Sequence, residues 1–284
     1  MNQPTRAAAV AVVLAAALAA GCATDPVTGE RELRLISVDQ EVAMGQEAAP
    51  EFEKEFGGKL ANETLQSYVR EVGGRVASKS DRQNVTYEFA LLASDVPNAF
   101  ALPGGKTYVT AGLMEIMTNE RQLAAVLGHE ITHVAAAHSV DQLQKAMGME
   151  LLAKLAGTAI GGSKGEAAEA GAKVAGAMVG LKYSRKHEYE ADQYGMLYLT
   201  RAGYSPWGMV ELLERLASLS EEKPGLIDGM MRTHPYTSDR IERCKELIRT
   251  TDAYRGFSPE TADPRAAHFR KMHALLLSVR GKKG

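Results

Sequence analysis

Cysteine is scarce in this sequence: Cys22 and Cys244 are the only two among 284 residues. A disulfide framework of the kind that holds small secreted domains together is therefore excluded. A large charge of one sign is also absent, because 33 Lys and Arg are balanced by 35 Asp and Glu, and the basic residues form no dense block. This balance gives no electrostatic basis for binding nucleic acid.

A hydrophobic run long enough to cross a bilayer is missing as well. Residues 7–20 are all apolar, but a transmembrane helix needs about 20 such residues, and the shorter length is typical of a signal-peptide core. The run ends in the string AAGC at residues 19–22, which resembles the bacterial lipobox. We therefore expect lipidation at Cys22, and an ordinary secreted protein is the alternative. Ala23 stands where an aspartate would favour retention in the inner membrane, so we expect the outer membrane.

The remaining chain is predicted to have an α+β fold that is mainly helical. Hydrophobic residues make up 45% of the sequence and charged residues 24%, which is typical of one globular domain with an ordinary core. Helical periodicity and capping residues predict helices over residues 37–56, 60–77, 207–219, 238–250 and 264–279.

A small antiparallel sheet is predicted before the middle of the chain. Residues 85–91 alternate between apolar and other side chains, as in a strand. Residues 98–102 and 106–110 flank Pro103-Gly104-Gly105, as in a β-hairpin. Further on, residues 151–181 are rich in alanine and glycine and predict a loop, followed by a helix that runs through Asp192.

The segment HEITH, residues 129–133, carries the strongest chemical signal. Asn119 is the predicted N-cap of its helix, with Gln122 as a capping-box partner. His129 and His133 stand one helical turn apart, so both imidazoles can reach a single Zn²⁺ ion. Glu130 follows His129 by about 100° around the helix, which leaves its carboxylate beside the metal as a base for water. A separate stripe is expected to face the core: Leu123, Leu127, Ile131 and Val134.

A catalytic zinc ion needs a third protein ligand and an open coordination position. No third histidine follows HEITH at short spacing on the same helix face, and the acidic candidates are Glu188, Glu190 and Asp192. Glu188 and Asp192 share a helix face, whereas Glu190 points about 200° away from each. We therefore assign Glu188 as the ligand and Asp192 as the acceptor that orients a zinc-bound histidine. A solvated charged helix is the alternative.

Four motifs in order give the chain a family resemblance. They are NAFALPGG at residues 98–105, HEITH, SRKHEYEAD at residues 184–192 and THPYTSDRI at residues 233–241. This order resembles the gluzincin metalloendopeptidases that include the CaaX prenyl protease, the bacterial heat-shock membrane protease and periplasmic lipoproteins that assist outer-membrane assembly. The resemblance implies a zincin-type catalytic domain with one Zn²⁺ per chain, held by His129, His133 and Glu188 and supported by Asp192.

The resemblance also implies a role for His234. A histidine of the last motif approaches the metal in such enzymes, either to stabilise the oxyanion or as an extra ligand that blocks the zinc at rest, and Arg240 is expected to hold the same loop. Thr132 and Ala137 depart from the family pattern, where glycine and arginine are common. His138 lies about 140° away from the zinc-binding face of a continuous helix and is expected to be structural.

The predicted function is that of a zinc-dependent endopeptidase acting on unfolded or misassembled envelope proteins. Glu130 would take a proton from water and pass it to the leaving amine, while zinc and His234 stabilise the oxyanion. Asn98, Ala99 and Phe100 are expected to lie in an edge strand to which an extended substrate adds. A zinc-containing chaperone or binding module for outer-membrane assembly intermediates is the alternative from another class, and a lipid-anchored structural protein without metal is a third.

These predictions divide the chain into four parts. They are a signal peptide (residues 1–21), a lipidated tether (residues 22–34), a zinc metalloprotease domain (residues 35–250) and a C-terminal helical tail (residues 251–284). The expected location is the periplasmic side of a bacterial cell envelope. The expected partners are unfolded protein substrates, the membrane through the lipid anchor, and the outer-membrane assembly machinery.

Overall fold

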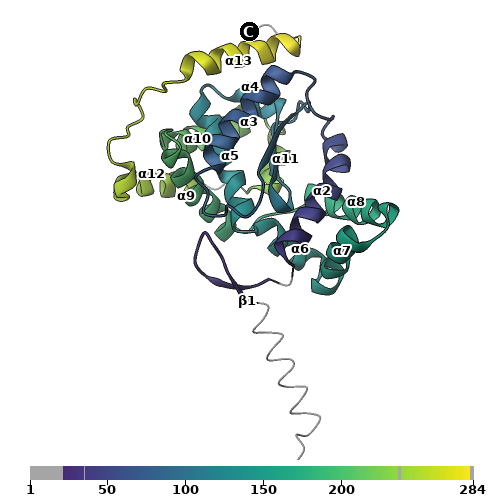
Figure 1. The fold of residues 1–284 in the computed structure, drawn as a ribbon. Helices are drawn as coiled ribbons and strands as arrows, with labels where there is room; N and C mark the ends of the chain where they lie inside the picture. The colour runs from purple at the N-terminus through teal and green to yellow at the C-terminus, as the bar shows by residue number, and fades with distance from the viewer. Residues whose placement is uncertain (1–21, 35, 236–237, 282–284) are drawn as a thin grey trace, which may run out of the picture.

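The structure, a computed structural model, describes residues 22–34, 36–235 and 238–281 (Figure 1). The helices are α2 (Val38–Glu55), α3 (Glu63–Ala77), α4 (Ala111–Ile116), α5 (Glu120–Ala135), α6 (His138–Met147), α7 (Met149–Gly161), α8 (Lys164–Val179), α9 (Arg185–Arg201), α10 (Trp207–Glu222), α11 (Asp228–Thr233), α12 (Ser238–Thr250) and α13 (Ala266–Val279). The strands are β1 (Cys22–Thr24), β2 (Arg31–Leu33), β3 (Glu88–Leu92), β4 (Ala99–Ala101) and β5 (Lys106–Thr110), and the short 3-10 helices are η1 (Pro103–Gly105) and η2 (Asp252–Tyr254).

The predicted signal peptide, residues 1–21, lies outside the described residues, as do Tyr236 and Thr237 of the last motif. Within the described ranges, every helix is too short or too polar to cross a membrane.

A three-stranded sheet with the order β3-β5-β4 runs through the middle of the fold (Figure 1). Strands β4 and β5 form the predicted antiparallel hairpin, with Phe100 opposite Tyr108. Strand β3, in contrast, pairs with β5 in parallel, with Ala90 opposite Tyr108, so the prediction of an entirely antiparallel sheet is wrong. Alternating side chains indicate that a segment is a strand, but they do not indicate its neighbour. The chain between β3 and β4 crosses to the far edge, and β5 then enters between them.

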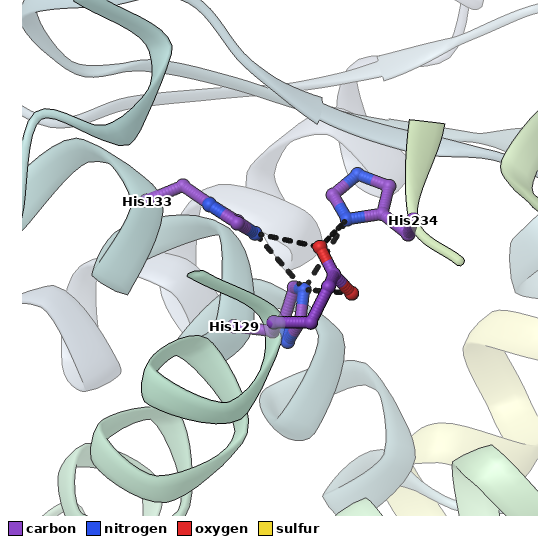
Figure 2. A group of neighbouring side chains, drawn as sticks. His129, His133 and His234 are labelled. Atoms are coloured by element: carbon purple, nitrogen blue, oxygen red, sulfur yellow. Dashed lines mark hydrogen bonds and ion pairs between the residues drawn. The ribbon is translucent and has the colours of Figure 1, made fainter. Parts of the chain in front are cut away.

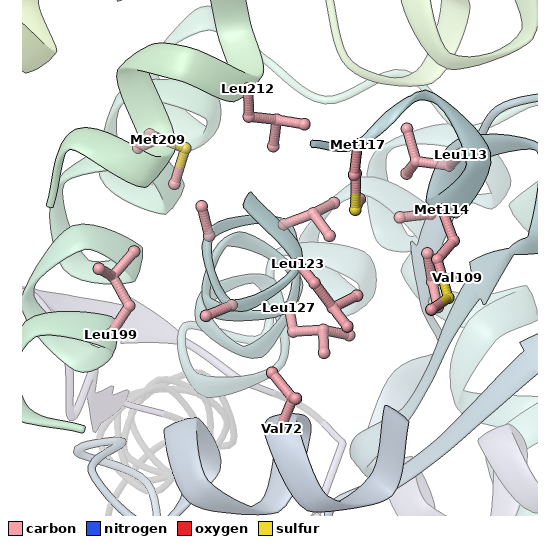
Figure 3. Close-up of a cluster of buried hydrophobic side chains, with 14 of the residues drawn as sticks. Val72, Val109, Leu113, Met114, Met117, Leu123, Leu127, Leu199, Met209 and Leu212 are labelled. Atoms are coloured by element: carbon pink, nitrogen blue, oxygen red, sulfur yellow. The ribbon is translucent and has the colours of Figure 1, made fainter. Parts of the chain in front are cut away.

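Helix α5 carries the HEITH segment through the largest hydrophobic cluster. Asn119 caps the helix, because its side chain accepts a hydrogen bond from the backbone N–H of Gln122. Leu123 and Leu127 are fully buried in this cluster. The side chains around them come from four other elements: Val72 of α3, Val109 of β5, Leu199 of α9 and Met209 of α10 (Figure 3). The buried stripe fixes the rotation of α5 about its axis, which directs its histidines to a different face.

Residues 151–181 are helical over most of their length, in α7 and α8, where a loop was predicted. Ser163 begins α8 with a capping box that includes Glu166. Both helices lie alongside α2 (Figure 1). A Cβ atom added at Gly171 would lie 2.2 Å from the backbone oxygen of Glu47 in α2, so this glycine permits close helix packing. Glycine content alone does not distinguish such packing from chain flexibility, because a missing side chain serves both.

Gly171→Ala is therefore expected to lower the free energy of unfolding by about 1–3 kcal/mol, because α8 must move away from α2. Gly176 provides a matched control in the same helix, since a Cβ atom there meets nothing within 4 Å. Gly176→Ala should instead raise the free energy of unfolding by up to about 1 kcal/mol, because alanine is the better helix former. Urea denaturation measures both values, and equal shifts would contradict the close contact between the helices.

Both ends of the described chain pack against the rest of the molecule. The hairpin of β1 and β2 places Val27 against Ala136 at the end of α5. At the other end, Phe269 and Leu276 of α13 are buried in the same hydrophobic cluster as α5. The side chain of Cys22 lies outside what the structure describes, so lipidation at this residue stays a prediction.

Candidate metal centre

Four side chains from α5, α9 and the end of α11 converge on one point: His129, His133, Glu188 and His234 (Figure 2). One nitrogen or oxygen atom of each lies within 4.8 Å of the corresponding atoms of the others. Nε2 of His129 is 3.1 Å from Nε2 of His133 and 3.3 Å from Nδ1 of His234. A carboxylate oxygen of Glu188 lies 3.0 Å from Nδ1 of His234 and 3.5 Å from Nε2 of His133. Figure 2 shows the three histidines pointing toward this common centre.

These separations fit a tetrahedral metal site. A Zn²⁺ ion holds imidazole nitrogens at about 2.0–2.1 Å, which places neighbouring ligand atoms about 3.3–3.4 Å apart. Five of the six pairs in the cluster have atoms 3.0 to 3.6 Å apart, and all four ligand atoms lie within 4.8 Å of one another. None of the four residues is more than 5% exposed, and lone pairs that meet in a buried space repel one another unless a cation or a proton lies between them. The donor set therefore suits a metal ion.

Asp192 and Arg240 hold the far side of His129. Nδ1 of His129 lies 3.0 Å from a carboxylate oxygen of Asp192, and Arg240 donates two hydrogen bonds to the same carboxylate at 2.6 and 2.7 Å. Arg240 also donates to Glu188 at 2.5 Å. Burial by itself raises the pKa of Glu188 and of Asp192, but Arg240 holds both pKa values below their usual range. Ionised Asp192 then accepts the Nδ1 proton of His129, which leaves Nε2 free to bind a metal.

His138 and Glu190 support His133 in a similar way. Nδ1 of His133 lies 2.9 Å from Nδ1 of His138, and Nε2 of His138 lies 3.2 Å from a carboxylate oxygen of Glu190. When Glu190 accepts the Nε2 proton of His138, Nδ1 of His138 becomes an acceptor for His133. The Nε2 lone pair of His133 then faces the cluster.

This role of His138 was not predicted, because the predicted position of its side chain assumed that the HEITH helix continues through residue 138. Helix α5 stops at Ala135, and Ala137 adopts a left-handed conformation with φ of 53°. This turn starts α6 at His138 and returns its side chain to His133. Alanine rarely adopts such a conformation, so no residue in the sequence signalled the turn.

A pair of glycines lets α9 approach α5 closely. A Cβ atom added at Gly128 would lie 2.9 Å from the backbone oxygen of Gly195, and one added at Gly195 would lie 2.9 Å from the backbone nitrogen of His129. Larger residues at this crossing would push α9 away, and Glu188 and Asp192 with it. Gly128, directly before HEITH, is the signal in the sequence from which this close crossing could have been predicted.

The cluster is closed to solvent in this conformation. The ring of Tyr183 stacks on His133 with the centroids 3.8 Å apart, and its hydroxyl forms a 2.9 Å hydrogen bond with Ser139. The backbone N–H of Tyr183 donates to the backbone oxygen of Thr233 at 3.0 Å. This bond links Tyr183, which covers the cluster, to the residue before His234. A peptide can reach the centre only after Tyr183 and His234 move.

Glu130 lies beside the cluster and is fully buried. Its carboxylate is 3.6 Å from Nε2 of His234, and neither of its oxygens has a hydrogen-bond partner in the part of the chain that the structure describes. Burial raises the pKa of Glu130, against the opposing effect of His234 and His129. A raised pKa brings this carboxyl group closer to the working pH, where a general base is most effective.

The residues expected to bind substrate lie on or beside the edge strand β4. The side chains of these three residues are buried in the protein interior. Phe100 packs edge-on against Phe52 with the ring centroids 5.0 Å apart, and the side chain of Asn98 accepts a hydrogen bond from the backbone N–H of Ala99. What β4 offers to a ligand is therefore its backbone.

The model of peptidase family M48 matches residues 63–248, a stretch that includes every member of the cluster. The chain belongs to this family. Membership of peptidase family M48 confirms the predicted family resemblance and makes the protein a metallopeptidase. The matched stretch also contains β3, β4 and β5.

Several relatives of this M48 member carry the names of proteases. The mitochondrial metalloendopeptidase OMA1 of Schizosaccharomyces pombe is 28% identical over 260 residues, which is 87% of this chain and 73% of the relative. Metalloprotease LoiP of Escherichia coli is 29% identical over 214 residues, 75% of this chain and 82% of the relative. The beta-barrel assembly-enhancing protease of Yersinia pestis is 29% identical over 214 residues, 72% of this chain. The match covers only 43% of that last relative.

Proposed function

We propose that this metallopeptidase is a zinc-dependent endopeptidase that cleaves unfolded or misassembled proteins of the cell envelope. The observation that carries the proposal is the convergence of His129, His133 and Glu188 on one buried point, with the carboxylate of Glu130 beside it. These three residues would hold the ion. Their separations suit zinc, and their outer partners fix which ring nitrogen of each histidine faces the centre.

The chemistry divides between the ion and the residues around it. A bound zinc ion would polarise the scissile carbonyl and lower the pKa of the attacking water. Glu130 removes a proton from that water and delivers it to the nitrogen of the leaving amine. The backbone of Asn98, Ala99 and Phe100 holds the substrate as an added strand along β4.

We assign His234 two positions. At rest its Nδ1 atom lies among the ligand atoms, 3.0 Å from Glu188, and it closes the site. Burial lowers the pKa of His234, but the carboxylates of Glu188 and Glu130 together raise it above its usual range. Either charge form of the imidazole has a ring N–H, so once displaced by substrate His234 donates a hydrogen bond to the oxyanion.

We further propose that the protein acts at the periplasmic side of a bacterial outer membrane. The small residues before Cys22 support a lipid anchor there. The name of the relative from Yersinia pestis, a beta-barrel assembly-enhancing protease, supports outer-membrane proteins as clients and their assembly machinery as a partner.

Metal removal tests the proposal. The protein purified without residues 1–21 is expected to contain zinc in equimolar amount and to digest labelled casein, an unfolded protein. Phenanthroline should abolish the digestion, and added zinc should restore it. Digestion that phenanthroline does not inhibit, or a purified chain that binds no zinc, would refute the proposal.

His138→Leu is expected to weaken zinc binding by about 10–100-fold, because His133 loses the acceptor that orients it. His138→Gln retains an acceptor oxygen and should bind zinc more tightly than the leucine variant. Competition with a chelating dye measures both affinities, and thermal melting of the zinc-free proteins checks that each variant folds. Zinc affinities equal to that of the wild type in both variants would show that His138 does not position His133.

A further inference from the structure

Strand β3 forms the second edge of the sheet, on the opposite side of β5 from β4. One half of this edge is already occupied by the chain itself. The N–H of Leu91 donates to the side chain of Gln66 at 2.9 Å, and its carbonyl accepts from the N–H of Leu60 at 2.8 Å. Lys59 lies opposite Leu92 in an antiparallel bridge. The segment before α3 therefore acts as a short antiparallel strand along this half.

The other half of the β3 edge has no such partner. Backbone groups of alternate residues in a strand point to the same side, so Phe89 directs its N–H and C=O outward, as Leu91 does. Among the residues that the structure describes, none forms a hydrogen bond with these outward groups of Phe89. The covering segment has left the edge by this point, because Asn62 caps α3 and the chain turns into the helix.

An open groove of about 670 Å³ lies along this free half, and we call it the β3 groove. Residues 87–90 form one wall, and α3 forms the other with Gln66, Arg70 and Gly74. Gly74 widens the groove, because a Cβ atom placed there would meet nothing within 4 Å. Charges of both signs stand around it: Lys59 and Arg70 are cationic, and Glu63 and Glu88 are anionic.

We propose that the β3 groove binds an extended segment of another protein, which adds to β3 as an antiparallel strand and bonds to the backbone of Phe89. The chain supplies the precedent, because its own residues 58–60 make this pairing on the next stretch of the same edge. An incoming strand would continue that line. The mixed charges favour recognition through the backbone, with side-chain preference secondary. This site is separate from β4 and does not depend on catalysis at the metal centre.

Binding of a labelled peptide of alternating threonine and valine to the full chain tests the proposal. The Glu130→Gln background prevents cleavage of the peptide. Gly74→Trp should fill the β3 groove and weaken binding roughly tenfold or more, because the backbone hydrogen bonds are lost. Gly176→Trp is the matched control, since Gly176 is also an exposed helical glycine with nothing within 4 Å of an added Cβ atom, and it should bind as the parent does. A melting temperature near that of the parent confirms that each variant folds.

Hydrogen exchange of backbone amides locates the peptide. The amide of Phe89 should exchange more slowly when the peptide is bound, whereas that of Leu91, already bonded to Gln66, should change little. The same peptide with methylated amide nitrogens should bind more weakly. Undiminished binding by Gly74→Trp, or protection of Ala99–Ala101 in place of Phe89, would overturn the proposal. Protection of Phe89 without peptide in a concentration-dependent dimer would also overturn it, because a second copy would then be the occupant.

Discussion

Replacing Glu130 with glutamine is expected to lower kcat for casein cleavage by about 10³-fold, the typical contribution of a positioned general base. Glutamine preserves the shape of the side chain but cannot accept the proton of the attacking water. His129, His133 and Glu188 are unchanged in this variant, so its zinc content should equal that of the wild type. Casein digestion and zinc analysis of the same preparation measure the two quantities.

The stability of Glu130→Gln provides an internal control. Glu130 is fully buried, and its oxygens lack hydrogen-bond partners in the described part of the chain. Ionising such a group costs free energy, so the neutral glutamine should leave the melting temperature of the zinc-free protein unchanged or raise it. Wild-type activity in the variant would remove Glu130 from the mechanism. A large fall in melting temperature would mean that lost activity reflects misfolding.

Arg240→Ala is expected to lower the free energy of unfolding of the zinc-free protein by about 3–5 kcal/mol, because it leaves buried carboxylates without their cation. Arg240 is 4% exposed and bonds to both Glu188 and Asp192. Arg249 provides a matched control on the same helix, α12, where it pairs with Glu246 and both side chains are more than half exposed. Arg249→Ala should change stability by less than about 0.5 kcal/mol.

Urea denaturation at several pH values extends this comparison. Arg240 holds the pKa of Asp192 below its usual range, against the effect of burial. The stabilisation from ionised Asp192 is therefore present above the unfolded pKa of about 3.9 and is lost as the pH falls through the lower folded pKa. In Arg240→Ala the free energy of unfolding should therefore fall less steeply as the pH is lowered through this acidic range. Equal stability losses in Arg240→Ala and Arg249→Ala would contradict the buried ion-pair network.

Much of the local structure could be predicted because its signals lie close together in the chain. Ser37 caps α2 with Gln40 in a capping box, and Asn119 caps α5. The predicted strand over residues 106–110 coincides with β5. The predicted apolar stripe on α5 is buried, since helical periodicity depends only on spacing within one element, but the other faces of this helix are buried as well.

Residues far apart in the sequence gave weaker signals. Glu188 and Asp192 share one face of a single helix, which spacing indicates, but their approach to α5 depends on Gly128 and Gly195, which lie on different helices. The prediction of a loop over the Gly-rich residues 151–181 was wrong because it, too, considered only residues that are close together in the sequence. Gly171 permits close packing of α8 against Glu47 of α2, a contact that spacing along the chain does not indicate.

The sequence by itself determined the capped or periodic elements such as α2, α5 and β5, the ordered motifs of the family and the histidines that share one face of α5. Only the tertiary structure decided that β3 runs parallel to β5 and leaves half of its outer edge free, and that Arg240 joins Glu188 to Asp192. It also decided that the turn at Ala137 brings His138 to HEITH. The physical reason is that caps and periodicity act over a few residues, whereas strand pairing, buried ion pairs and close helix crossings depend on how distant segments meet.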